Sequence, residues 1–121
     1  MFIFLLFIIS CQQVTEEEDS IIKNTIKLFA PFITYKPDPE GTDFWQYPEE
    51  TMNLKTGDCE DIVNYCRKMI YDTGYLKTNL AVVVHKKTGE GHTLLEYNGK
   101  HYECVNAKIK VNMNNYEKKA L

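Results

Sequence analysis

Thr56-Gly57-Asp58-Cys59-Glu60-Asp61 runs directly into the segment 62–72, and this stretch decides the fold. Apolar side chains recur along it at steps of three and four, a spacing typical of an amphipathic helix over Cys59–Asp72. The apolar positions are Ile62, Val63, Cys66, Met69 and Ile70. Asp58 suits the N-cap, Gly57 suits the turn before it, and Gly74 is expected to end the helix. The sequence therefore places a cysteine in the first turn of a packed helix.

Cys59 is a candidate nucleophile because of this position. Backbone N–H groups in the first turn of a helix lack partners, and together with the helix dipole they stabilise a thiolate. The same N–H groups can hydrogen-bond a developing oxyanion. The alternative interpretation is that Cys59 is only a small buried residue, as we expect for Cys66 and Cys104.

A small antiparallel sheet is predicted downstream of this helix. Strands are expected over 80–86, 92–97 and 101–106, with a fourth over 108–112, and Asn98-Gly99 is a hairpin turn signal. Helices that precede an antiparallel sheet indicate an α+β fold. His92 opens the second strand, and Asn106 ends the third.

The register of this hairpin decides which side chain faces His92. A three-residue loop pairs His92 with Asn106 and separates apolar from charged side chains better, so we favour it. A two-residue turn at Asn98-Gly99 instead places Glu103 on the face of His92. In either case the polar partner would orient the imidazole, which serves the thiol as its base. His85 and His101 are expected to be structural or surface residues.

Upstream of Cys59 the signals are weaker. A helix is predicted over Thr15–Phe29, stopped by Pro31. The segment 31–57 shows no period, and long loops of this kind are often functional. Trp45 lies there in an aromatic cluster that either plugs the core or lines a cleft. The polar tail, residues 113–121, is expected to be frayed.

Composition limits the class of protein. The chain has 121 residues with 44% hydrophobic side chains and a formal net charge of -3. This length predicts one domain, over residues 12–121. With 14 basic and 17 acidic residues there is no electrostatic footprint for nucleic acid, so no nucleic-acid partner is expected.

The segment 1–11 is predicted to direct export. Met1–Ile9 is an unbroken apolar run, too short to span a bilayer, and Ser10-Cys11 follows it. Ile8-Ile9-Ser10-Cys11 resembles a lipoprotein cleavage box, which predicts a lipid anchor at Cys11 and a periplasmic or membrane-anchored location. No Lys or Arg precedes the run, so a buried N-terminal strand is the alternative.

The motifs together resemble the transglutaminase-like cysteine peptidase superfamily. The resemblance covers residues 43–107 and rests on Gly57-Asp58-Cys59-Glu60-Asp61, preceded by Trp45-x-x-Pro48-Glu49-Glu50, and on Gly91-His92-Thr93-Leu94-Leu95. The strand Gly99–Asn106 is similar to the family's next strand, which usually ends in aspartate. The resemblance implies a papain-like fold and acyl chemistry on protein amide bonds, by hydrolysis or transfer.

The expected catalytic set is Cys59, His92 and Asn106, acting on a protein or peptide substrate. Trp45 and Gln46 are candidates for the substrate cleft and for the oxyanion partner. No cofactor is expected; Asp58 and Asp61 are the candidate ligands for calcium, which some relatives hold. The alternatives are a catalytically inactive peptide-binding module of the same fold and a structural lipoprotein with no site.

Overall fold

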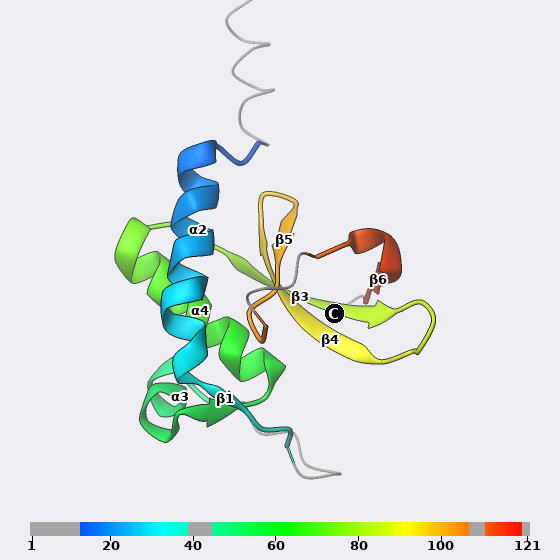
Figure 1. Cartoon of the computed structure of the whole chain (residues 1–121), viewed down its shortest axis with the longest axis horizontal. Coiled ribbons are helices and arrows are strands. Elements are labelled where there is room, and N and C mark those ends of the chain that lie inside the picture. The colour runs from blue at the N-terminus through cyan, green and yellow to red at the C-terminus, as the bar shows by residue number, and fades with distance from the viewer. Residues whose placement is uncertain (1–12, 39–44, 107–110, 120–121) are drawn as a thin grey trace, which may run out of the picture.

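The computed structural model describes residues 13–38, 45–106 and 111–119. Its order of elements confirms the α+β class: two long helices come first and an antiparallel sheet follows (Figure 1). The predicted export segment, residues 1–11 with Cys11, lies outside the described residues. Within the described part of the chain, no helix has both the length and the apolar character needed to cross a membrane.

The first helix, α2 (Glu16–Phe29), begins with a capping box. The Thr15 side chain accepts the backbone N–H of Glu18, and the Glu18 side chain accepts that of Thr15. A short 3-10 turn, η1 (Ala30–Phe32), follows at Pro31, where the expected stop occurs. Ile22 and Ile26 bury the inner face of α2 against the main core.

The segment 31–57 contains more structure than its sequence predicted. Strand β1 (Thr34–Tyr35) pairs in parallel with β2 (Thr56–Gly57). Helix α3 (Pro48–Leu54) comes between these two strands in the sequence. Proline favours the first turn of a helix, so Pro48 starts α3 instead of preventing it. The pairing of β1 with β2 brings Tyr35 beside Gly57.

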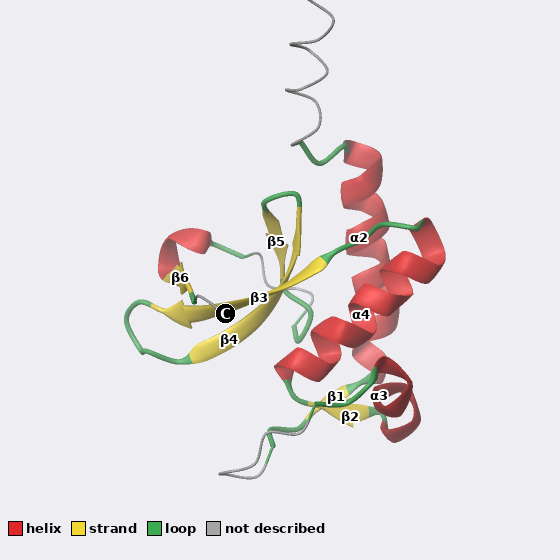
Figure 2. Ribbon diagram, turned by 180° about the vertical axis from the view of Figure 1, so that it is seen from behind, coloured by secondary structure: helices red, strands yellow, loops and turns green. Residues whose placement is uncertain are grey.

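The second long helix, α4 (Cys59–Gly74), begins at the predicted residue. It packs against α2, α3 and strands β3 and β4, and therefore lies at the centre of the molecule (Figure 2). Its predicted apolar face is buried, with Ile62, Val63, Cys66 and Ile70 at 1% exposure or less. Tyr75, in the left-handed conformation, caps the helix one residue beyond Gly74.

The larger sheet has four strands in the order β5-β4-β3-β6. Strands β3 (Asn79–His85), β4 (Gly91–Tyr97) and β5 (Lys100–Tyr102) form an antiparallel meander, and β6 (Tyr116–Lys118) pairs with β3. The tail is therefore partly a strand, contrary to the expectation of fraying. Most of the predicted strand 108–112 lies outside the described residues.

The hairpin register differs from the one that we favoured. Tyr97 pairs with Lys100 through a two-residue turn, in which Asn98 and Gly99 have φ values of 47° and 84°. Two successive positive φ values suit the tight turns that match the twist of paired strands. The prediction of the register assumed that apolar and charged residues lie on opposite faces of the hairpin. Leu94 and Leu95 are both fully buried, so each face of β4 carries an apolar residue and the assumption does not hold.

Candidate active site

Cys59 lies where the first turn of α4 meets the sheet. Its thiol is half-buried, and Sγ donates to Thr93 Oγ1 on β4 at 3.5 Å. A hydrogen bond also joins the Cys59 sulfur to the His92 ring. The structure thus brings together the predicted thiol and the predicted imidazole, from a helix and a strand that are far apart in sequence.

His92 has a carboxylate on its other side. The ring Nε2–H donates to Glu103 Oε2 at 2.7 Å, and Glu103 Oε1 accepts the Val105 backbone N–H at 3.1 Å. The Glu103 side chain is only 8% exposed. Because Nε2 is bound to Glu103, Nδ1 is the ring nitrogen left to exchange a proton with the thiol.

These contacts favour a charged imidazole. The hydrogen bond with Cys59, and next the one with Glu103, raise the pKa of His92 from 6.5 to about 10, although partial burial opposes the shift. The negative charges of both partners act in the same direction. The site is therefore suited to hold the His92 ring in its protonated form at neutral pH.

Asn106 does not lie on strand β5, where it was predicted. Strand β5 ends at Tyr102, not at Asn106, and Asn106 is exposed in the turn that follows. The register on which its assignment rested is not the observed one. The two-residue turn was the alternative that named Glu103, and Glu103 is the side chain that contacts His92.

Asp61 organises the start of α4. The Asp58 side chain accepts the Asp61 N–H, and Asp61 Oδ2 accepts the Asp58 N–H, which completes a capping box. Asp61 Oδ1 accepts the backbone N–H of Gln46 at 3.1 Å and so ties the loop before α3 to the helix. A Cβ at Gly57 would lie 2.7 Å from Asp61 Cβ, so only glycine fits there.

The two residues of the predicted cleft have different settings. Gln46 Oε1 accepts the Thr51 hydroxyl at 2.9 Å, which leaves its amide NH2 as the donor end. Trp45 is 61% exposed and lines an open groove along α4. Gln46 lines the same groove, whereas Cys59 and His92 do not.

A cluster of three carboxylates adjoins the thiol. One oxygen from each of Asp38, Asp58 and Asp61 lies within 4.8 Å of the other two. Burial is the largest of the effects that together raise the pKa of Asp58 to about 7; the nearby Asp61 charge and the hydrogen bonds with Asp61 and Asp38 act in the same direction, and one backbone hydrogen bond opposes them. Oxygen-only clusters of this kind suit Ca²⁺, and Asp38 is a member that sequence reasoning missed.

Tyr35 is a second residue near the site that sequence reasoning missed. Partial burial raises the pKa of its phenol, and the charges of Cys59 and Asp58 raise it further, so the ring lies close to both groups. Only the parallel pairing of β1 with β2 brings Tyr35 there, and the sequence gives no signal for that pairing.

The chain was compared with known proteins. The model of the family described as bacterial transglutaminase-like cysteine proteinase matches residues 12–119. Calcium-bound LapG of Legionella pneumophila has a similar fold, with a TM-score of 0.68 at 17% identity over 83% of this chain. A second LapG structure from that organism gives 0.63 at 18% identity over 74% of this chain.

This chain covers only part of those structures. The two alignments span 62% and 55% of the LapG chains, so this protein matches less than two thirds of their length. No curated protein matches it.

Proposed function

Because this chain belongs to the bacterial transglutaminase-like cysteine proteinases, we propose that it cleaves peptide bonds with Cys59 as nucleophile, His92 as acid–base and Glu103 as the residue that orients His92. The observation that carries the proposal is the chain of contacts from the Cys59 sulfur through the His92 ring to Glu103 Oε2. Glu103 takes the place that the sequence analysis gave to Asn106.

The first half-reaction forms an acyl-enzyme. The Cys59 thiolate attacks the substrate carbonyl carbon, and the oxygen that becomes negative meets backbone N–H groups at the start of α4. His92 gives its Nδ1 proton to the leaving nitrogen as the C–N bond breaks. A thioester and a free amine result.

The second half-reaction restores the thiol. Neutral His92 takes a proton from water, the hydroxide attacks the thioester carbon, and the Cys59 thiolate leaves as the acid product forms. Glu103 holds the ring in one orientation through both halves. An amine in place of water would give transfer, and we favour hydrolysis because the family is one of proteinases.

The test compares the three cysteines of the described residues, Cys59, Cys66 and Cys104. Wild-type protein and Cys59→Ala are incubated with a peptide library, and cleaved products are identified by mass spectrometry. We expect cleavage by wild type only. Iodoacetamide at neutral pH should label Cys59 roughly tenfold or more faster than Cys66 and Cys104, which are fully buried.

The outcomes separate the alternatives. Fast labelling of Cys59 without cleavage of any peptide would favour a peptide-binding module that lacks activity. Equal, slow labelling of all three thiols would contradict the enzymatic proposal. Cys59→Ser serves as the matched variant, because it keeps the size and polarity of the side chain while removing the sulfur.

We further propose that Asp38, Asp58 and Asp61 bind calcium. The support is the carboxylate cluster itself and the fold shared with calcium-bound LapG. Asp58 and Asp61 each use oxygens to accept backbone N–H groups, and carboxylate oxygens retain lone pairs for a cation. Calcium there would neutralise the crowded charges and hold the β1 end against the first turn of α4.

Thermal unfolding and calorimetry test the calcium proposal. We expect Ca²⁺ to raise the Tm and EDTA to reverse the rise, with Mg²⁺ less effective. Asp38→Asn should weaken binding, whereas Asp72→Asn, at an exposed acid of α4 outside the cluster, should not. An unchanged Tm and no heat of binding would overturn the proposal.

A further inference from the structure

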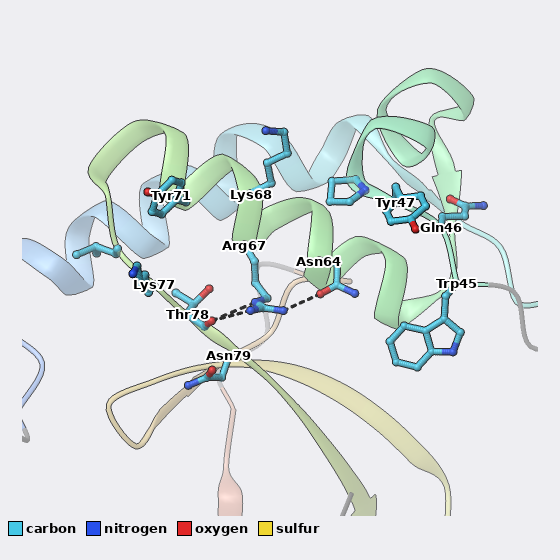
Figure 3. Close-up of a pocket in the computed structure, with 12 residues that line it drawn as sticks. Trp45, Gln46, Tyr47, Asn64, Arg67, Lys68, Tyr71, Lys77, Thr78 and Asn79 are labelled. Atoms are coloured by element: carbon cyan, nitrogen blue, oxygen red, sulfur yellow. Dashed lines mark hydrogen bonds between the residues drawn. The ribbon is translucent and has the colours of Figure 1, made fainter.

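A groove of about 790 Å³ runs along α4 on the side of the start of β3 (Figure 3). Trp45 lies at the end of the groove near the beginning of α4, and Tyr71 and Lys77 lie at the opposite end. Its walls come from three segments: residues 45–48 before and in α3, the α4 side chains of Asn64, Arg67, Lys68 and Tyr71, and residues 76–79 that lead into β3.

One end of this groove is joined to the first turn of α4 by a hydrogen bond. Gln46 lines the groove, and its backbone N–H donates to Asp61, two residues after Cys59. An extended substrate whose scissile bond lies at Cys59 can therefore continue into the groove. The groove walls include none of the proposed catalytic side chains, so a role there concerns binding.

The charge of the groove is opposite to that of the chain. Its charged lining residues are Arg67, Lys68 and Lys77, and none of its lining residues is acidic. The whole chain carries a net charge of -3. The Lys68 ammonium forms ion pairs with Asp72 at 3.2 Å and with Glu49 at 3.8 Å. Arg67 and Lys77 are therefore the cations more available to a ligand.

Arg67 is held in position by its own chain. Its Nε and Nη2 donate to the Thr78 carbonyl at 3.2 and 2.9 Å, and its Nη1 donates to Asn64 Oδ1 at 2.9 Å. These contacts use three of the five guanidinium N–H groups, which leaves two for a ligand within the described part of the chain. A guanidinium fixed in this way binds a carboxylate with little further loss of side-chain entropy.

Thr78 supplies a second, independent sign of a ligand. This groove residue is only 5% exposed, yet its Oγ1 has no hydrogen-bond partner among the described residues. A buried hydroxyl without a partner costs free energy. A polar group bound in the groove would offset that cost.

We propose that this groove binds an acidic side chain of the protein substrate, with Arg67 and Lys77 as its cations; the inference rests on the proposed peptidase function. Arg67 follows Cys59 by eight residues, so it lies about 12 Å along the helix axis. An extended peptide advances about 3.3 Å per residue. The acidic residue therefore lies roughly four positions from the cleaved bond.

The first arm of the test measures binding without catalysis. ¹⁵N-labelled Cys59→Ala is titrated with an Ala-Gly peptide that carries three consecutive glutamates, and with the same peptide carrying glutamines. We expect the glutamate peptide to shift the amide signals of Arg67, Thr78 and Asn79 and to bind more weakly in high salt. Equal binding of both peptides, or no binding of either, would overturn the proposal.

Three second-site variants, each made in Cys59→Ala, locate the binding. Lys77→Glu, at an exposed position, should weaken binding of the glutamate peptide roughly tenfold. Arg67→Gln should weaken it further, and Lys77→Glu keeps the test valid if Arg67→Gln disturbs folding. Lys27→Glu makes the same charge change at an exposed position on α2 and should leave binding unchanged. Equal loss with Lys27→Glu would indicate only a net-charge effect and would also overturn the proposal.

The second arm measures cleavage-site preference. Wild type should enrich Asp and Glu three to five residues from the bond it cleaves, and Lys77→Glu should remove the enrichment from the peptides that it still cleaves. Specific binding without any cleavage would refute the peptidase function and leave the groove assignment intact. Cleavage without acidic preference would refute the groove assignment alone.

Discussion

Two histidine–glutamate pairs lie on or beside the β4–β5 hairpin, and the nitrogen–oxygen distance within each pair is the same. His92 Nε2 lies 2.7 Å from Glu103 Oε2, and His101 Nε2 lies 2.7 Å from Glu96 Oε2. The second pair joins directly opposed residues of β4 and β5, whereas Glu103 follows the end of β5. The distance within the pair therefore does not distinguish the two, although only His92 and Glu103 meet in hydrogen-bond geometry; among the described residues His101 Nε2 and Glu96 Oε2 have no hydrogen-bond partner.

The third neighbour does distinguish them. His92 also contacts the Cys59 sulfur, and its side chain is 25% exposed. Glu96 also forms an ion pair with the Lys118 ammonium of β6 at 2.6 Å, which together with the charge of His101 lowers the pKa of Glu96. One pair thus contacts a thiol, and the other joins strands β4, β5 and β6. A histidine–carboxylate pair becomes a candidate catalytic element through the group on its far side.

Replacing the two histidines gives the largest expected contrast. His92→Ala should lower kcat/KM by about 10³-fold, because the thiol loses its acid–base partner. His101→Ala should leave kcat/KM nearly unchanged and lower the free energy of unfolding by about 1–2 kcal/mol, because Glu96 loses a partner. Peptide-cleavage kinetics and urea unfolding on both variants measure this, and equal loss of activity in the two would end the distinction.

Replacing the carboxylates tests orientation. Glu103→Gln should lower kcat on the order of 10²-fold, because the imidazolium loses its charged partner. Glu96→Gln should affect stability and leave kcat unchanged. Asn106→Ala decides whether Glu103 or Asn106 is the residue that orients His92. A kcat that falls for Asn106→Ala and not for Glu103→Gln would restore the original prediction.

The pH dependence sharpens the comparison next. A folded-state pKa of about 10, above the unfolded value of about 6.5, means that the charged His92 ring stabilises the fold fully below pH 6.5. That stabilisation is lost as the pH rises through 10. NMR titration of the His92 ring should follow this, and Cys59→Ala should lower the pKa, because it removes the strongest contribution. A His92 ring that titrates near 6.5 in wild type would contradict the assigned contacts.

The smallest expected effect is at Lys118. Its side chain is 57% exposed, so Lys118→Gln should change the free energy of unfolding by no more than about 1 kcal/mol. Cleavage should be unaffected, because Lys118 contacts Glu96 and not the His92–Glu103 pair that we propose as catalytic. Loss of activity in this variant, with stability preserved, would show that the two histidine–glutamate pairs are coupled.

Helix α4 and the β3–β4 strands were predictable because their signals are local. The apolar spacing after Cys59, the aspartate N-cap and the run of β-branched residues in β3 each depend on neighbouring positions in sequence. The meeting of Cys59 with His92 also followed, since the helix must pack on the sheet. Helix α4, strands β3 and β4 and the proximity of Cys59 to His92 could therefore be predicted from the sequence.

The remaining features depend on contacts between segments that are far apart in sequence. The favoured hairpin register was wrong because β4 buries an apolar residue on each of its faces, Leu94 and Leu95. The alternation of apolar and polar residues along the strand therefore cannot distinguish between the two registers. Strand β6 and the β1–β2 pair are short, and no period marks them. Asp38 and Tyr35 reach the site only through that pairing, so no pattern around Cys59 predicts them.

The close approach of Gly57 to Asp61 has a consequence for protein engineering. Three neighbours fix the position of Asp61. Its side chain occupies the space that a Cβ at residue 57 would need, it exchanges two hydrogen bonds with Asp58, and it accepts a hydrogen bond from the Gln46 backbone N–H. Transfer of the Cys59 site to another scaffold therefore requires the five residues from Gly57 to Asp61, together with a loop backbone N–H at the position of Gln46. Transfer of the cysteine alone would leave out the hydrogen bonds that fix the orientation of the first turn of α4.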